Sequence, residues 1–144
     1  MPDPIPFGTP AWAAALREGL NGSSEYRNAA AKWGVGWNGN LLLAFEADGA
    51  LAAPLHLFLE LAAGRCTRAE FVGGSGRDRA EAGFTLRAPF SLWRDILERR
   101  VLAATAILTG KMKVEGDRLA LLRHAGANRA LIHVTGSVPT RFPS

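Results

Sequence analysis

The chain has 144 residues, of which 48% are hydrophobic and 21% charged. This composition is typical of one globular domain and excludes a disordered chain. The formal net charge of +4 comes mainly from arginines spread along the chain, which indicates a solubilising surface more than a nucleic-acid interface. No apolar run is long enough to span a membrane. Cys66 is the only cysteine, so no internal disulfide can form and we expect a cytoplasmic protein.

Two short helices are predicted at the beginning of the chain. Residues 1–8 are rich in proline, lack the pattern of a signal peptide and are expected to form an irregular arm. Thr9 can cap a helix that has Pro10 at its first position. Ser23 can cap a second helix, which we expect to continue to Trp33 and to stop at the following glycine.

The hydrophobic pattern then changes to a period of two, which is typical of strands. Four strands are expected, over residues 41–46, 55–61, 66–72 and 84–88. In the second strand the four leucines fall on one face, whereas His56, Phe58 and Glu60 fall on the other. Consecutive strands joined by tight turns pair antiparallel, so the pattern predicts a largely antiparallel sheet.

Helices return after this sheet. Ser91 can cap a helix that carries Trp93. Residues 101–108 are almost wholly apolar, which predicts either a buried helix or a segment that lines something apolar. A short strand over 112–114, a helix over 118–125 and a helical or extended piece over 127–134 complete the expected domain, residues 9–136; an irregular tail over 137–144 follows. The predicted fold is α+β, with a five-stranded, mostly antiparallel sheet covered on one face by helices.

The segment from Ala106 to Asp117, AILTGKMKVEGD, is followed by Leu119 and Leu122. Its order of helix, Gly-Lys-apolar-Lys-apolar-x-Gly-Asp and helix resembles the C-terminal third of the sterol carrier protein 2 (SCP2) family. The resemblance implies an SCP2-like fold with an apolar tunnel. It also implies non-enzymatic binding, and transfer, of a lipid: a fatty acid, acyl-CoA, phospholipid or sterol.

Apolar side chains on the predicted sheet and covering helices are the candidates for the tunnel wall. They are Phe58, Phe84, Leu86, Trp93, Ile107, Leu108, Met112, Leu119 and Leu122. The alternative for each residue is a place in an ordinary hydrophobic core. Lys111 and Lys113 should share one side of the short strand, where they either solvate an edge strand or form a basic rim for lipid head groups. Such a rim would allow transient contact with an anionic membrane surface.

Other functions have weaker support in the sequence. The same apolar groove could serve an accessory protein-interaction or dimerisation module. A small enzyme using His56 or Cys66 would need an orienting motif, which the sequence lacks. The three histidines do not have metal-ligand spacing. We therefore expect no catalysis, metal, cofactor or nucleic-acid partner, and a monomer or weak homodimer.

Overall fold

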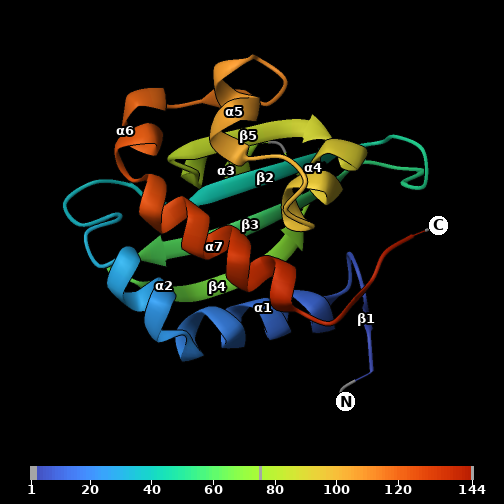
Figure 1. The fold of residues 1–144 in the computed structure, drawn as a ribbon, viewed down its shortest axis with the longest axis horizontal. Helices are drawn as coiled ribbons and strands as arrows, with labels where there is room; N and C mark the ends of the chain where they lie inside the picture. Colours follow the sequence, from blue (N-terminus) through green and yellow to red (C-terminus); the bar gives the residue numbers. More distant parts are fainter. Residues whose placement is uncertain (1–2, 75, 144) are drawn as a thin grey trace.

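The structure, a computed structural model, describes residues 3–74 and 76–143 (Figure 1). Two helices lead the chain. Helix α1 (Pro10–Gly22) begins after Thr9, whose side chain accepts a hydrogen bond from the backbone N–H of Trp12. Helix α2 (Ser24–Ala29) begins after Ser23, which caps it in the same way. Both predicted caps are confirmed.

Helix α2 ends earlier than the sequence predicts, at Ala29 instead of near Trp33. The chain turns after α2 so that the indole Nε1 of Trp33 donates to the carbonyl oxygen of Gly39 at 2.8 Å. A buried indole N–H needs such a partner. The side chain of Trp33 therefore enters the core from a turn and not from a helix.

A sheet of five strands forms the middle of the molecule, in the order β4-β3-β2-β5-β6. Strands β2 and β5 run parallel, and every other neighbouring pair is antiparallel. The predicted, mostly antiparallel five-stranded sheet is thus confirmed. Its strands are β2 (Leu41–Glu46), β3 (Leu55–Ala62), β4 (Arg65–Val72), β5 (Phe84–Pro89) and β6 (Lys113–Glu115).

The predicted alternation of β3 is confirmed by its burial. Leu57, Leu59 and Leu61 belong to the main hydrophobic core, on the face that the helices cover. Phe58 is also fully buried, but it lies on the opposite face, where the guanidinium of Arg68 stands 4.7 Å above its ring. The two faces of the sheet therefore differ, because one is apolar and the other carries charged side chains such as Arg68.

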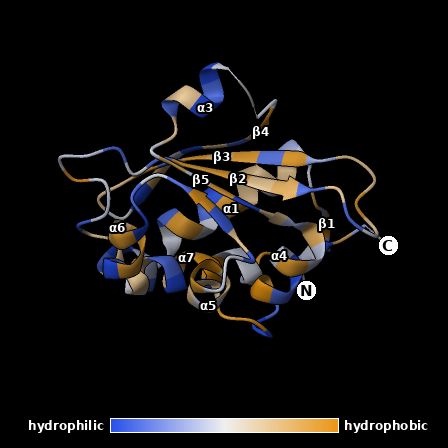
Figure 2. Ribbon diagram, turned by 90° about the horizontal axis from the view of Figure 1, so that it is seen from above, coloured by the Kyte–Doolittle hydropathy of each residue, from blue (hydrophilic) through white to orange (hydrophobic). Residues whose placement is uncertain are grey.

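The helices lie mainly on the apolar face (Figure 2). Helix α7 (Ala125–Ser137) crosses it beside α1 (Figure 1). Helices α4 (Phe90–Leu97), α5 (Ala103–Leu108) and α6 (Arg118–Arg123) cover the remainder. The short helix α3 (Arg77–Glu81) lies on the other face, near β4, to which Arg68 connects it through Asp78 and Glu81.

Two predictions about these helices are wrong. Helix α4 begins at Phe90 after Pro89, and Ser91 is inside the helix, where it bonds to the carboxylate of Asp48. The apolar segment 101–108 is not a fully buried helix. Helix α5 starts at Ala103, and a helix of six residues turns only one side to the sheet, so Leu102 and Leu108 are 70% and 65% exposed.

Two short segments near the ends of the described chain pair with each other, within the regions that the sequence predicts as an irregular arm and an irregular tail. Strand β1 (Ile5–Pro6) pairs in parallel with β7 (Thr140–Arg141). Phe7 fixes this pair, because its ring lies 4.9 Å from Trp12 and 5.7 Å from Phe142. Of the expected arm and tail, residues 1, 2 and 144 lie outside the described part.

Candidate functional site

Five of the predicted lining residues converge on the apolar layer between the sheet and the helices. Strand β5 contributes Phe84 and Leu86, which point to the same face because they are two residues apart. Trp93 comes from α4, Ile107 from α5 and Met112 from the turn before β6. All except the half-buried Leu86 are no more than 6% exposed. This group is called the apolar layer below.

The polar groups of this layer are satisfied within it. The indole of Trp93 donates to the carbonyl oxygen of Ala44 at 3.0 Å. The backbone N–H of Met112 donates to the carbonyl oxygen of Ala106 in α5, also at 3.0 Å. No buried side-chain nitrogen or oxygen in the described part of the chain lacks a partner. The layer can therefore bind an apolar ligand through dispersion contacts and burial of apolar surface, but it has no unpaired polar side chain to bind a polar group.

The other four predicted lining residues are not in this layer. Phe58 lies on the opposite face of the sheet, as its alternation with Leu57 already implied. Leu108 is exposed, and Leu119 is 68% exposed on α6. Leu122 is half-buried. The structure shows no open tunnel among the five residues that do converge.

A narrow gap adjoins the apolar layer, and no pattern in the sequence pointed to it directly. It is too narrow to hold a water molecule. Its wall connects with the layer because the ring of Trp33 lies 5.3 Å from that of Phe84. The gap is lined by Tyr26, Trp33, Leu41, Leu61, Ala127, Asn128 and Leu131.

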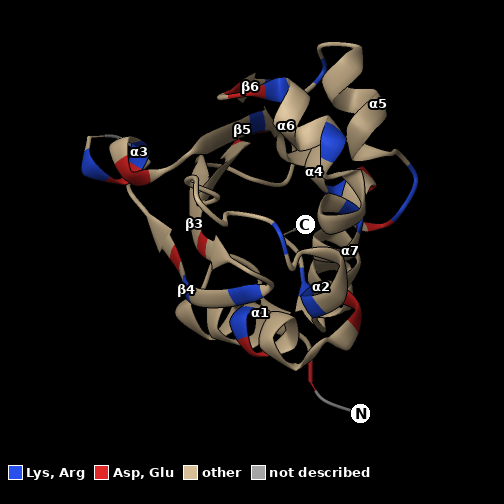
Figure 3. Ribbon diagram, turned by 90° about the vertical axis from the view of Figure 1, so that its left-hand side faces the viewer, with Lys and Arg blue, Asp and Glu red and all other residues tan. Residues whose placement is uncertain are grey.

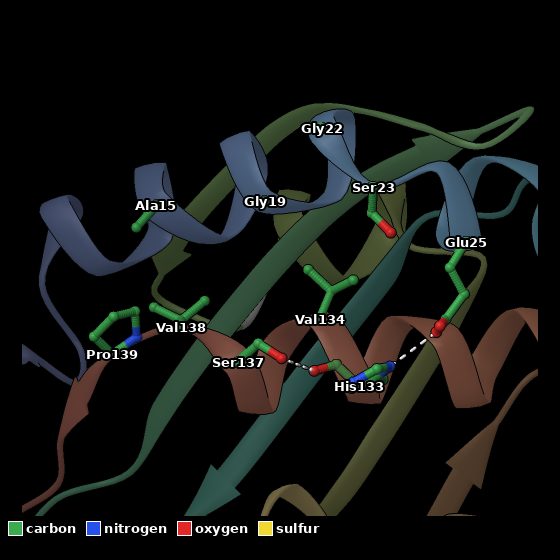
Figure 4. Close-up of a pocket in the computed structure, with 10 residues that line it drawn as sticks. All are labelled: Ala15, Gly19, Gly22, Ser23, Glu25, His133, Val134, Ser137, Val138 and Pro139. Carbon is green, nitrogen blue, oxygen red and sulfur yellow. Dashed lines mark hydrogen bonds and ion pairs between the residues drawn. The ribbon is translucent and has the colours of Figure 1, made fainter. Parts of the chain in front are cut away.

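A more open groove lies between α1 and α7 (Figure 4). Its volume is about 420 Å³, and its apolar wall includes Val134 and Val138. On its rim, Nδ1 of His133 forms a hydrogen bond with a carboxylate oxygen of Glu25, at 2.9 Å. None of the predicted lining residues reaches this groove, which Gly19 and Gly22 of α1 help to form.

The two lysines of the predicted rim are both exposed, one on each side of the buried Met112. Lys113 belongs to β6, the edge strand of the sheet, and Lys111 to the turn that precedes it. Neither takes part in an ion pair within the described residues. Both ammonium groups are therefore available to an anion outside the chain.

His56 and Cys66 do not form a catalytic pair, because they lie on opposite faces of the sheet. The thiol of Cys66 is in the core and donates to the carbonyl oxygen of Arg68 at 3.4 Å. Burial raises the pKa of this thiol to about 11, so it stays protonated at neutral pH. Burial, assisted by Arg87 and Arg79, lowers the pKa of His56.

No group of three or more metal-ligating side chains occurs among the described residues. No helix in that part of the chain is long and apolar enough to cross a membrane.

Comparison with known proteins gives a consistent result. The SCP-2 sterol transfer family matches residues 20–127. A crystal structure of sterol carrier protein 2 is 30% identical, with a TM-score of 0.78 over 92% of this chain and 98% of that one. A conserved hypothetical protein of Thermus thermophilus, suggested to be a sterol carrier protein, is 29% identical, with a TM-score of 0.79 over 97% of this chain and 94% of that one.

Sterol carrier protein 2 of Yarrowia lipolytica, in its apo form, shares the fold at 15% identity, with a TM-score of 0.56 over 90% of this chain and 92% of that one. The sequence has no significant match among curated proteins. The family match covers well over half of the chain, and the neighbours share its α+β architecture. The chain belongs to the SCP-2 sterol transfer family.

Proposed function

We propose that this protein binds an apolar lipid between the sheet and the helices and transfers it without catalysing a reaction. The observation that carries the proposal is the convergence of Phe84, Leu86, Trp93, Ile107 and Met112 on one apolar layer. Sterol transfer is the activity for which the matching family is named. The ligand class we infer is a fatty acid, an acyl-CoA, a phospholipid or a sterol.

The layer is closed on one side by a part of the chain that has little support of its own. We define the lid segment as residues 99–123, between the last cap of α4 and the first cap of α7. Its helices α5 and α6 have six residues each, which is well below the length at which a helix is stable alone. Burial of Ala106 and Ile107 holds α5 against the sheet. Displacement of this segment would open the layer to a ligand.

The free energy gained by moving an acyl chain from water into such a layer is large enough for binding. Burial of each methylene contributes about 0.8 kcal/mol, so a long acyl chain gains about 10 kcal/mol before ordering and lid opening are subtracted. An affinity in the micromolar range remains. The exposed Lys111 and Lys113 lie on the lid segment, where they could meet a carboxylate or phosphate head group and bring the protein into transient contact with an anionic membrane.

The groove between α1 and α7 suits this role less well, because it is open and has the polar side chains of Glu25 and His133 on its rim. A dimerisation module using the apolar layer is not favoured either, since the side chains of the layer are buried within the monomer. We propose a monomer or weak dimer without nucleic-acid partners. The unpaired thiol of Cys66 agrees with a reducing compartment, and we propose the cytoplasm.

Titration with a fluorescent fatty acid tests the proposal. Leu86→Trp places a larger side chain in the layer and should weaken binding at least tenfold. Val35→Trp adds similar bulk at a position that is 56% exposed and outside the layer, so binding should be unchanged. Both variants are first checked for cooperative thermal unfolding. Equal binding by Leu86→Trp and the parent protein would contradict the assigned site.

A further inference from the structure

The lid segment presents an unusual combination of exposed leucines and positive charge. Leu102, Leu108 and Leu119 are each 65–70% exposed, and they are the most exposed large hydrophobic side chains in the described part of the chain. Helices α5 and α6 lie next to each other in Figures 1 and 3. Arg118 connects them directly, since its guanidinium donates to the carbonyl oxygen of Ile107 at 3.0 Å. Leu108 and Leu119, the neighbours of these two residues, therefore lie at the same end of the molecule.

The net positive charge of the protein is concentrated on this same segment. Residues 99–123 contain six Lys and Arg against two Asp and Glu, so they carry a net charge of +4. The whole chain also has a net charge of +4, so the remaining 119 residues are neutral in sum. Arg99, Lys111 and Lys113 form no ion pair within the described residues. Figure 3 shows basic positions of this segment on β6 and α6, and others beside α4 on the connection between α4 and α5.

A tryptophan stands beside this surface. The ring of Trp37, 37% exposed, lies 5.5 Å from that of His124, which directly follows α6. Trp37 thus adjoins the end of α6 that is remote from Leu119. Indole rings prefer the boundary between water and lipid head groups.

We propose that the lid segment is the surface by which the protein docks on an anionic lipid bilayer, with the three leucines entering the head-group region. The segment combines exposed leucines with three cations that have no ion pair within the described residues, and these match such a bilayer, which offers hydrocarbon beneath a layer of negative charge. A nucleic acid would offer phosphates to the cations but no apolar region in which the leucine side chains could be buried. The inference rests on the proposed function, because docking through the lid would place the apolar layer against the membrane that supplies or receives the ligand.

Flotation with vesicles tests the docking surface in the absence of any fluorescent ligand. The full-length protein should float with vesicles of 70% phosphatidylcholine and 30% phosphatidylglycerol and much less with pure phosphatidylcholine. Sodium chloride at 1 M should reduce binding, because the Debye length falls to about 3 Å. Lys111→Gln with Lys113→Gln should weaken binding about 25-fold, from about fivefold for each charge.

Matched variants separate the surface from overall charge. Arg17→Gln with Arg65→Gln removes the same charge from exposed positions on α1 and β4 and should weaken binding far less. Leu108→Gln with Leu119→Gln should reduce binding to anionic vesicles at least tenfold without lowering the unfolding temperature, since both side chains are already exposed. Equal loss with the two charge pairs, or no loss with the leucine pair, would overturn the proposal.

The outcome is independent of the lipid-binding assay. Vesicle docking without uptake of fluorescent fatty acid would sustain the surface and contradict the proposed function. Uptake of fluorescent fatty acid without any vesicle docking would support the proposed function and overturn the docking surface. Failure to bind any vesicle, together with capture of a protein partner that depends on Leu108 and Leu119, would replace the membrane by a protein as the occupant and overturn the inference.

Discussion

Replacing Ile107 by Ala should loosen the lid segment without loosening the remainder of the fold. Ile107 is 6% exposed and holds α5 against the apolar layer. The substitution removes three buried carbons, which at about 0.8 kcal/mol each amounts to about 2.4 kcal/mol before any cavity term. If α5 opens independently of the remaining fold, this loss of burial free energy destabilises mainly the closed state of the lid segment relative to its open state. The open population should then rise about 50-fold.

Two measurements check this expectation. Amide hydrogen exchange in residues 103–123 should accelerate by about that factor relative to the strands, and the association rate of a fluorescent fatty acid should increase with it. Ile96→Ala is the matched control, because Ile96 is 1% exposed on α4, outside the lid segment. It should lower global stability without selective exchange in the lid. Should either variant fail to fold, valine at the same positions gives a milder change.

Amides of α5 that exchange only with global unfolding, in the parent protein and in Ile107→Ala alike, would show that the lid segment does not open on its own. The lid segment would then be part of the same cooperative unit as the sheet. An unchanged association rate, despite faster exchange, would show that the ligand does not pass beneath α5.

Three further predictions concern the sheet. Asn21→Ala should cost about 1–3 kcal/mol in urea unfolding, because the Asn21 amide both donates to and accepts from the backbone of Cys66, each at 2.8 Å. Cys66 should react slowly with a disulfide reagent at pH 8 and quickly in denaturant, since its folded-state pKa of about 11 keeps it a thiol; equal rates would contradict its burial. Below about pH 6.5 the unfolded chain protonates His56 more readily than the folded chain, whose His56 pKa is lowered, so stability should decrease as the pH falls. His56→Gln should flatten this part of the profile, as measured by thermal unfolding between pH 5 and 8.

The regular parts of the fold were predictable because they depend on local patterns. Thr9 and Ser23 are cap residues placed just before apolar helical spacing, and each caps its helix in the structure. The alternation of Leu57 and Leu59 with Phe58 placed these residues on opposite faces. Strand and helix periodicity is informative because each element must bury one face.

The candidate site was predictable only in part. An apolar composition does not tell which side of a six-residue helix meets the sheet, and so Leu108 and Leu119 were expected inside although they are exposed. The pairing of Ile5 with Thr140 joins residues at opposite ends of the chain and has no local signal. Trp33 lines the narrow gap from a turn, a position that depends on its hydrogen bond to Gly39.

The most direct test of lipid binding is native mass spectrometry of the protein purified from cells, followed by organic extraction and identification of the bound molecule. We expect a stoichiometric apolar lipid, lost on extraction and regained when fatty acid is added back. A mass of the chain alone, together with no uptake of added fatty acid, would contradict it.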